Sequence, residues 1–199
     1  GMMVAIFGVT FGWPMWAAIV VTFVICVAFG AVNGYIVVKT GLPSFIVTLA
    51  TLFILRGFTI FIPQTVERKT IIGGIREAAE GDWLAPIFGA KIGGPIFNWL
   101  GDMGIIAVFE RGNRAGEPVV NGIPMLMIWA IGLVIFGHWL LTRTRFGNWI
   151  YASGGDADAA RNSGVPVSAV KIQMFMFTAF CATVFAVCQV MEFGSAGAD

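Results

Sequence analysis

Charged residues are scarce in this chain of 199 residues, of which 12% are charged and 58% are hydrophobic. A soluble domain averages about 25% charged residues, so the composition excludes an ordinary soluble protein and indicates a polytopic membrane protein. The net charge of +1 provides no basic surface for a nucleic acid. The single histidine and the three cysteines, which lack CxxC spacing, argue against a metal site built from these residues.

Carboxylates are also missing from the hydrophobic runs, except for Glu192 at the edge of the last one. Ion-coupled secondary transporters commonly place Asp, Glu or His inside their membrane spans, so this class is the weaker alternative, although it remains open. The chain contains neither an HExxH nor a GxSxG motif, which disfavours a membrane-embedded zinc protease or serine hydrolase. We therefore expect no catalytic residue and no cofactor bound by this chain.

Four hydrophobic runs are long enough to cross a membrane, at about 16–38, 42–62, 122–141 and 170–191. Residues 2–11 are too short to span, and we expect them to be the tail of a fifth helix that begins outside this sequence. The predicted fold class is an all-α transmembrane helix bundle, with residues 1–199 forming part of one membrane-spanning domain.

The orientation of the bundle is predicted from its basic residues. Lys39 lies in the short connection between the first two spans, and Arg143, Arg145, Arg161 and Lys171 lie in or next to the connection 142–169. The long loop 63–121, in contrast, has more acidic than basic residues. Because Lys and Arg are enriched in short cytoplasmic connections, we expect Lys39 and the connection 142–169 to be cytoplasmic and 63–121 to be an outer loop. Trp139 and Trp149 fit an aromatic belt at the cytoplasmic face.

A small, polar, Gly-rich segment lies between the last two spans, at residues 151–167. Asp156 is a suitable N-cap for a helix that begins at Ala157. Gly164 suits the left-handed position after the helix, and Pro166 prevents its continuation. A helix of two turns is too short to be stable alone in water, so we hypothesise that it docks in a groove of another protein. The alternative is an ordinary solvated loop.

The side chains of this short helix fit a docking surface. Asp158 places negative charge in the first turn, and its i,i+3 spacing from Arg161 allows a weak ion pair. The alanines at 157, 159 and 160 predict a small, flat surface.

Two blocks of sequence carry a family resemblance. TRTRFGNWIYASGGDADAARNSGVPVSAVKI (142–172) resembles the cytoplasmic signature of ABC-importer permeases of the ribose/xylose branch, T-x-x-G-x-x-x-Y-A-x-G-G-x-x-x-A-A-x-x-S-G-I-x-V. GAVNGYIVVKTGLPSFIVTLATLFILRGFTIFI (30–62) is similar to the same family's N-G-x-x-V-x-x-x-x-x-P-x-F-I-V-T-L-x-T-x-x-x-x-R-G. Val165 stands where the family usually has Ile. The residues of the first block that match are Thr144, Gly147, Tyr151, Ala152, Gly154, Gly155, Ala159, Ala160, Ser163, Gly164 and Val167.

The resemblance implies a multi-pass subunit of a bacterial inner-membrane importer for a monosaccharide or related polyol. It implies a second permease copy, two ATPase subunits that bind ATP, and a periplasmic sugar-binding protein as partners. Asp156–Ser163 would be the coupling helix that receives the stroke of the ATPase. The family's permeases are longer, with further helices at both ends. The residues assigned to ATPase coupling are Gly154, Gly155, Asp156, Asp158, Ala159, Ala160, Arg161, Ser163 and Gly164.

Four polar positions in the first two spans are candidates for the translocation path: Asn33, Thr48, Thr51 and Arg56. For the neutral residues, hydrogen bonding between helices is the favoured alternative. For Arg56 we favour snorkelling to the outer interface and a structural break at Gly57. Gly30 and Gly34 form a GxxxG pair, which indicates close helix packing.

Overall fold

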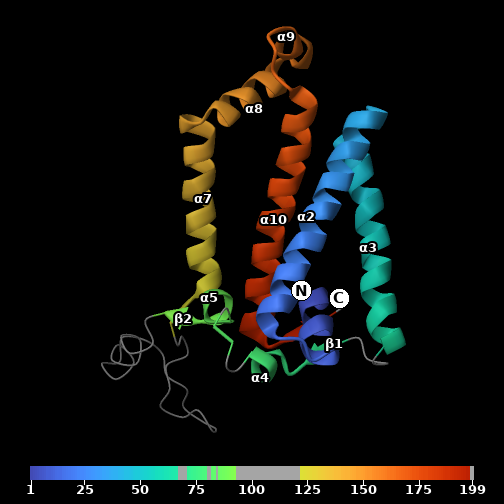
Figure 1. Ribbon diagram of the computed structural model, residues 1–199, viewed down its shortest axis with the longest axis vertical. Coiled ribbons are helices and arrows are strands. Elements are labelled where there is room, and N and C mark those ends of the chain that lie inside the picture. Colours follow the sequence, from blue (N-terminus) through green and yellow to red (C-terminus); the bar gives the residue numbers. More distant parts are fainter. Residues whose placement is uncertain (67–70, 80–81, 84, 93–121, 198–199) are drawn as a thin grey trace, which may run out of the picture.

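The computed structural model describes residues 1–66, 71–79, 82–83, 85–92 and 122–197 (Figure 1). Four of its helices are long and apolar enough to cross a membrane, which confirms the four predicted spans and the all-α fold class. Each helix extends past at least one of its predicted ends. The four are α2 (Met15–Thr40), α3 (Ser44–Val66), α7 (Met125–Arg143) and α10 (Val167–Phe193).

Helices α2 and α10 form the tightest contact between spans, and the GxxxG glycines lie in it. A Cβ atom added at Gly30 would lie 2.8 Å from both Ala179 Cβ and Phe175 O, and one at Gly34 would lie 2.8 Å from Ile172 Cα. Carbon atoms do not approach so closely, so only glycine lets the two backbones meet here. The packing role predicted for this GxxxG pair is therefore confirmed.

Helix α3 corrects one detail of the sequence analysis. The predicted break at Gly57 is absent, because the helix continues through this residue and through Pro63 to Val66. Among the described residues, nothing lies within 4 Å of a Cβ atom added at Gly57, so no neighbour in that part of the chain forces the backbone to deviate there. Gly is unfavourable in a helix by about 1 kcal/mol, which is too little to interrupt a span of this length.

Short elements close the end of the bundle that carries the N-terminus (Figure 1). The expected tail of a helix forms a short α-helix, α1 (Met2–Ala5), followed by a π-helix, η1 (Ile6–Thr10). The predicted outer loop contributes α4 (Ile75–Ala79) and α5 (Ala85–Gly89); its remainder at 93–121 lies outside the described residues.

Two small antiparallel ribbons, not predicted from the sequence, tie distant segments together at the same end. Strand β1 (Ile71–Gly73) pairs with β4 (Ser195–Gly197), with Ile72 opposite Ala196. Strand β2 (Lys91–Ile92) pairs with β3 (Ile123–Pro124). The buried core gathers around them, and its fully enclosed members include Val4, Met15, Ile75, Val187 and Cys188.

The opposite end of the bundle carries the two predicted cytoplasmic connections. Helices α2 and α3 are joined there by a tight turn in which Gly41 has a φ of 68°. Helices α7 and α10 are joined by α8 (Arg145–Gly155) and α9 (Ala157–Asn162). In Figure 1, α9 stands beyond the ends of all four spans. The structure thus brings both basic connections to one end, as the orientation argument requires.

Candidate coupling helix and transport cavity

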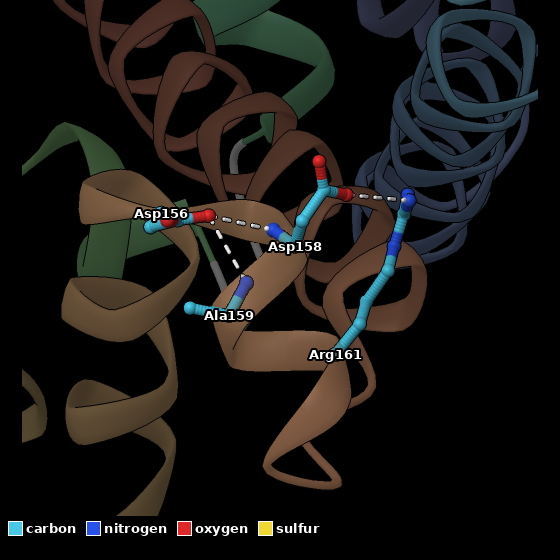
Figure 2. Close-up of polar contacts among 4 residues, drawn as sticks. All are labelled: Asp156, Asp158, Ala159 and Arg161. Carbon is cyan, nitrogen blue, oxygen red and sulfur yellow. Dashed lines mark hydrogen bonds and ion pairs between the residues drawn. The ribbon is translucent and has the colours of Figure 1, made fainter.

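The N-terminus of α9 is capped as its sequence predicts. Asp156 Oδ1 accepts hydrogen bonds from the backbone N–H groups of Asp158, at 2.9 Å, and of Ala159, at 3.0 Å (Figure 2). These bonds satisfy two of the donors that a helix N-terminus leaves without partners. A carboxylate at this position also interacts favourably with the helix dipole. The helix therefore begins at Ala157, the residue expected.

The C-terminus of α9 is equally well defined. Gly164 has a φ of 82°, a conformation that favours glycine. The N–H of Gly164 donates to Arg161 O, and the N–H of Val165 donates to Ala160 O, both at 3.0 Å. These bonds occupy two of the last carbonyl groups of α9. Pro166 follows as the N-cap of α10, so α9 is a separate, fixed element.

The ion pair within α9 contributes little to its stability. Arg161 Nη1 lies 3.5 Å from Asp158 Oδ1, and the two side chains are 57% and 88% exposed. Exposed pairs of this kind are screened by water and salt, so their typical contribution is below about 1 kcal/mol. Figure 2 shows the Arg161 side chain extending along α9 toward Asp158, and because both side chains are exposed they remain available to another molecule.

The three alanines of α9 do not share one exposed surface. Ala159 is exposed, Ala157 is half-buried, and Ala160 is 5% exposed. Ser163 is exposed, and its hydroxyl donates to Ala159 O at 2.9 Å. The flat surface inferred from the sequence is therefore narrower than expected. Ala159 is its centre, while Ala160 faces the protein's own interior and fixes α9 in place.

Helix α8 is an element that the sequence analysis missed. It begins with a cap in which Thr144 Oγ1 accepts a hydrogen bond from Gly147 N at 3.1 Å. Gly154 and Gly155 belong to its last turn, so they are not part of the docking helix itself. The Thr-x-x-Gly spacing at 144–147 was the available signal, because a threonine three residues before a helical N–H group can cap it.

Gly147 holds α8 against the end of α7. A Cβ atom added there would lie 2.5 Å from Leu140 O and 2.6 Å from Leu141 Cα, and closer still to Leu141 O. These atoms belong to the backbone of α7 and cannot move aside as a side chain can. The glycine of the signature is thus required by close packing and not by a left-handed conformation.

A cavity of about 720 Å³ lies beside α10, lined by residues of α1, α2, α3, α8 and α10. Its wall is mostly apolar, with Phe29, Leu55, Phe58 and Phe175 among the lining residues. Helix α8 contributes Ile150, Ser153 and Gly154 to the wall. Because α9 follows α8 after one residue, the candidate coupling helix is attached directly to an element that borders the cavity.

The four candidate path residues divide between cavity and packing. Asn33 and Thr48 line the cavity. The hydroxyl of Thr51 donates to Asn33 Oδ1 at 2.7 Å and joins α2 to α3, so it takes the interhelical role favoured for it. Thr48 donates to carbonyl groups of its own helix. Arg56 is exposed on α3 and does not line the cavity.

Several polar residues of the cavity were not singled out from the sequence, among them Thr59, Thr178, Thr183, Ser153 and Lys171. Lys171, near the start of α10, lines it at the α9 end. Ser153 also lines it, and its Oγ atom is buried without a hydrogen-bond partner among the described residues. Neither position has a local pattern that marks it, because each acquires its place only when α8 folds over α10.

The four spans, the capped helix beyond them and the cavity bordered by α8 define a multi-pass membrane protein. Comparison with known proteins identifies the family to which this membrane protein belongs. Residues 1–199 match the family described as branched-chain amino acid transport system / permease component. The chain therefore belongs to this permease family. It is a multi-pass protein of the inner membrane.

Its relatives include sugar permeases. The chain is 31% identical to the xylose transport system permease protein XylH of Escherichia coli (strain K12), over 88% of this chain and 51% of the relative. It is 30% identical to the ribose import permease protein RbsC of the same strain, over 85% of this chain and 42% of the relative. The chain thus spans about half the length of these curated relatives. No solved structure matches it.

Proposed function

We propose that this chain is part of the membrane subunit of an ATP-driven, binding-protein-dependent importer of a monosaccharide or related polyol. The observation that supports this most directly is α9, a doubly capped helix that stands beyond the spans and exposes Ala159. Membership of the permease family and the likeness to XylH and RbsC point the same way.

In this proposal the chain carries no catalytic site of its own. Two separate ATPase subunits bind and hydrolyse ATP, and α9 docks on one of them. A second permease copy completes the membrane part, and a periplasmic binding protein delivers the sugar to the outer end. The segment from Asp156 to Ser163 receives the ATPase stroke, with Gly154 and Gly155 linking it to α8 and Gly164 linking it to α10.

The geometry suggests how the stroke reaches the transport path. Helix α9 is held between α8 and α10 by its caps and by the burial of Ala160. A displacement of α9 is therefore passed to α8, which borders the cavity through Ile150, Ser153 and Gly154. The polar lining residues Asn33 and Thr48 then contact the passing sugar.

The proposal is tested by purifying the importer from its native membranes and measuring both the ATPase that accompanies it and the ATP-driven uptake of ribose and xylose. We expect Ala159→Arg to abolish both, because a long charged side chain prevents close docking. Ala159→Ser should leave both unchanged. Asn148→Arg, which adds the same charge to an exposed position of α8, is the matched control and should also be silent.

The result that contradicts the proposal is uptake that continues after ATP depletion but stops when the ion gradient collapses. That outcome would indicate an ion-coupled secondary transporter. Retention of the ATPase by Ala159→Arg, with normal uptake, would instead show that α9 is an ordinary solvated connection.

A further inference from the structure

Two arginines flank the corner at which the span α7 ends and α8 begins. Arg143 is the last residue of α7, and Arg145 is the first residue of α8, with the capping Thr144 between them. Both side chains are exposed. Among the residues that the structure describes, neither arginine forms an ion pair; the pair in this region joins Arg161 to Asp158 on α9. The corner therefore presents two positive charges whose counter-ions do not come from the described part of the chain.

Each of these arginines shares a helix face with an exposed tryptophan. Trp139 precedes Arg143 by four residues on α7, and Trp149 follows Arg145 by four residues on α8. Residues with this spacing are neighbours on a helix surface. The two indole rings belong to residues that are 52% and 37% exposed. Indole rings are favoured at the membrane–water interface, where their apolar body and N–H group both find partners.

The corner also lies at the depth of the lipid headgroups. Helix α7 has 19 residues, which corresponds to about 28 Å at 1.5 Å per residue and matches the hydrocarbon core of a bilayer. None of its residues is buried by the rest of the described structure. In Figure 1 the corner is close to the level of the ends of α2 and α10, whereas α9 stands farther out. A protein that docks on α9 therefore approaches beyond the corner, and lipid is the nearer neighbour.

We propose that Arg143, Arg145, Trp139 and Trp149 form a binding site for the phosphate group of an anionic phospholipid, in the leaflet on the α9 side. A guanidinium group can donate two parallel hydrogen bonds to phosphate oxygens. The tryptophans pack on the glycerol and upper acyl region. The lipid holds the α7–α8 corner at a constant depth, from which α8 extends to α9. This inference does not depend on the transported substrate or on ATP.

The test is a titration of the purified chain in detergent with dioleoylphosphatidylglycerol, followed by native mass spectrometry, with dioleoylphosphatidylcholine as the neutral reference. A cation near an anionic lipid surface contributes roughly fivefold to binding. We therefore expect the double variant R143Q/R145Q to weaken phosphatidylglycerol binding by roughly 25-fold. Phosphatidylcholine carries the same phosphate group, but its choline cation makes the lipid neutral overall, so its binding should be weaker and should fall much less. R143K/R145K should recover most of the affinity because the charge is retained.

The matched control is R161Q, which removes the same kind of charge from the same end of the molecule but from α9. We expect it to retain phosphatidylglycerol affinity. Circular dichroism of each variant checks that the helices are intact. Equal loss in R161Q and in R143Q/R145Q would overturn the site, because it would reveal only a general attraction to positive charge. Equal affinity of the wild-type chain for both lipids would overturn it as well. Loss of an accompanying ATPase from R143Q/R145Q with unchanged lipid binding would assign the corner to a protein partner instead.

Discussion

Substitution of Gly147 by alanine is the sharpest test of how α9 is positioned. The added Cβ atom would lie 2.5 Å from Leu140 O and 2.6 Å from Leu141 Cα, about 1 Å inside ordinary contact distances. Overpacking of this kind typically costs about 1–3 kcal/mol. Because the opposing atoms are backbone, we expect α8 to rotate away from α7 about its cap at Thr144, and not a side chain to adjust.

The rotation is amplified along α8. Gly147 lies three residues past Thr144, whereas Ala157 lies thirteen residues past it. At 1.5 Å per residue, a shift of about 1 Å at Gly147 moves the start of α9 by roughly 4 Å. We therefore expect Gly147→Ala to lower the free energy of unfolding of the purified chain by about 2 kcal/mol. It should also uncouple ATP hydrolysis from uptake in the assembled importer.

Gly154 and Gly155 provide matched controls on the same helix. In the part of the chain that the structure describes, nothing lies within 4 Å of a Cβ atom added at either position. Alanine is favoured over glycine in helices by up to about 1 kcal/mol, so alanine at these positions should be neutral or stabilising. The stability is measured by thermal or denaturant unfolding in detergent. If Gly147→Ala unfolds like the wild-type chain and remains fully coupled, close packing is not the reason for this glycine and the argument fails.

Three further predictions concern separate contacts. Gly30→Leu should destabilise the chain by several kcal/mol, because it separates α2 from α10. Gly132→Leu should not, because no described residue lies within 4 Å of a Cβ atom added there. Equal melting temperatures of the two variants would contradict this prediction. Asp156→Ala should destabilise α9 by about 1 kcal/mol and speed the hydrogen exchange of the backbone amides that Asp156 caps. Asp156→Asn should largely preserve the protection of these amides from exchange. Unchanged exchange in the alanine variant would count against the cap. Ser153→Ala should raise the free energy of unfolding by about 1 kcal/mol, because it removes a buried hydroxyl that has no hydrogen-bond partner among the described residues. A lower free energy of unfolding would instead reveal a hydrogen-bond partner for that hydroxyl.

The sequence predicts best those features that are encoded within a few residues. The caps of α9 are of this kind, because Asp156 and Gly164 act on backbone groups no more than four residues away. The four spans are also local, since each is a single apolar run. The family motifs at 142–172 and 30–62 marked the right region without revealing its geometry.

Features that depend on distant segments escaped the sequence analysis. Strand β1 pairs with β4 across more than 100 residues, and no turn signal connects them. The burial of Ala160 depends on α8 and α10, so the sequence of α9 alone predicts a wider flat surface than the structure has. Gly57 illustrates the opposite error, because a local helix breaker was given more weight than the continuous apolar run around it.

The distribution of close packing along the bundle determines how a displacement of α9 could spread through the structure. The buried core lies at the end closed by α1, β1 and β4, where residues such as Val4, Ile75 and Val187 are fully enclosed. Toward α9, α2 still contacts α10, since Gly34 meets Ile172 there, but α8 borders the cavity instead of a packed core. Displacing a well-packed core requires many contacts to break at once, whereas a wall beside an existing cavity can shift with few losses. A force applied at α9 therefore meets least resistance at the α8 wall, and the end closed by the core would move only if the spans move as rigid bodies.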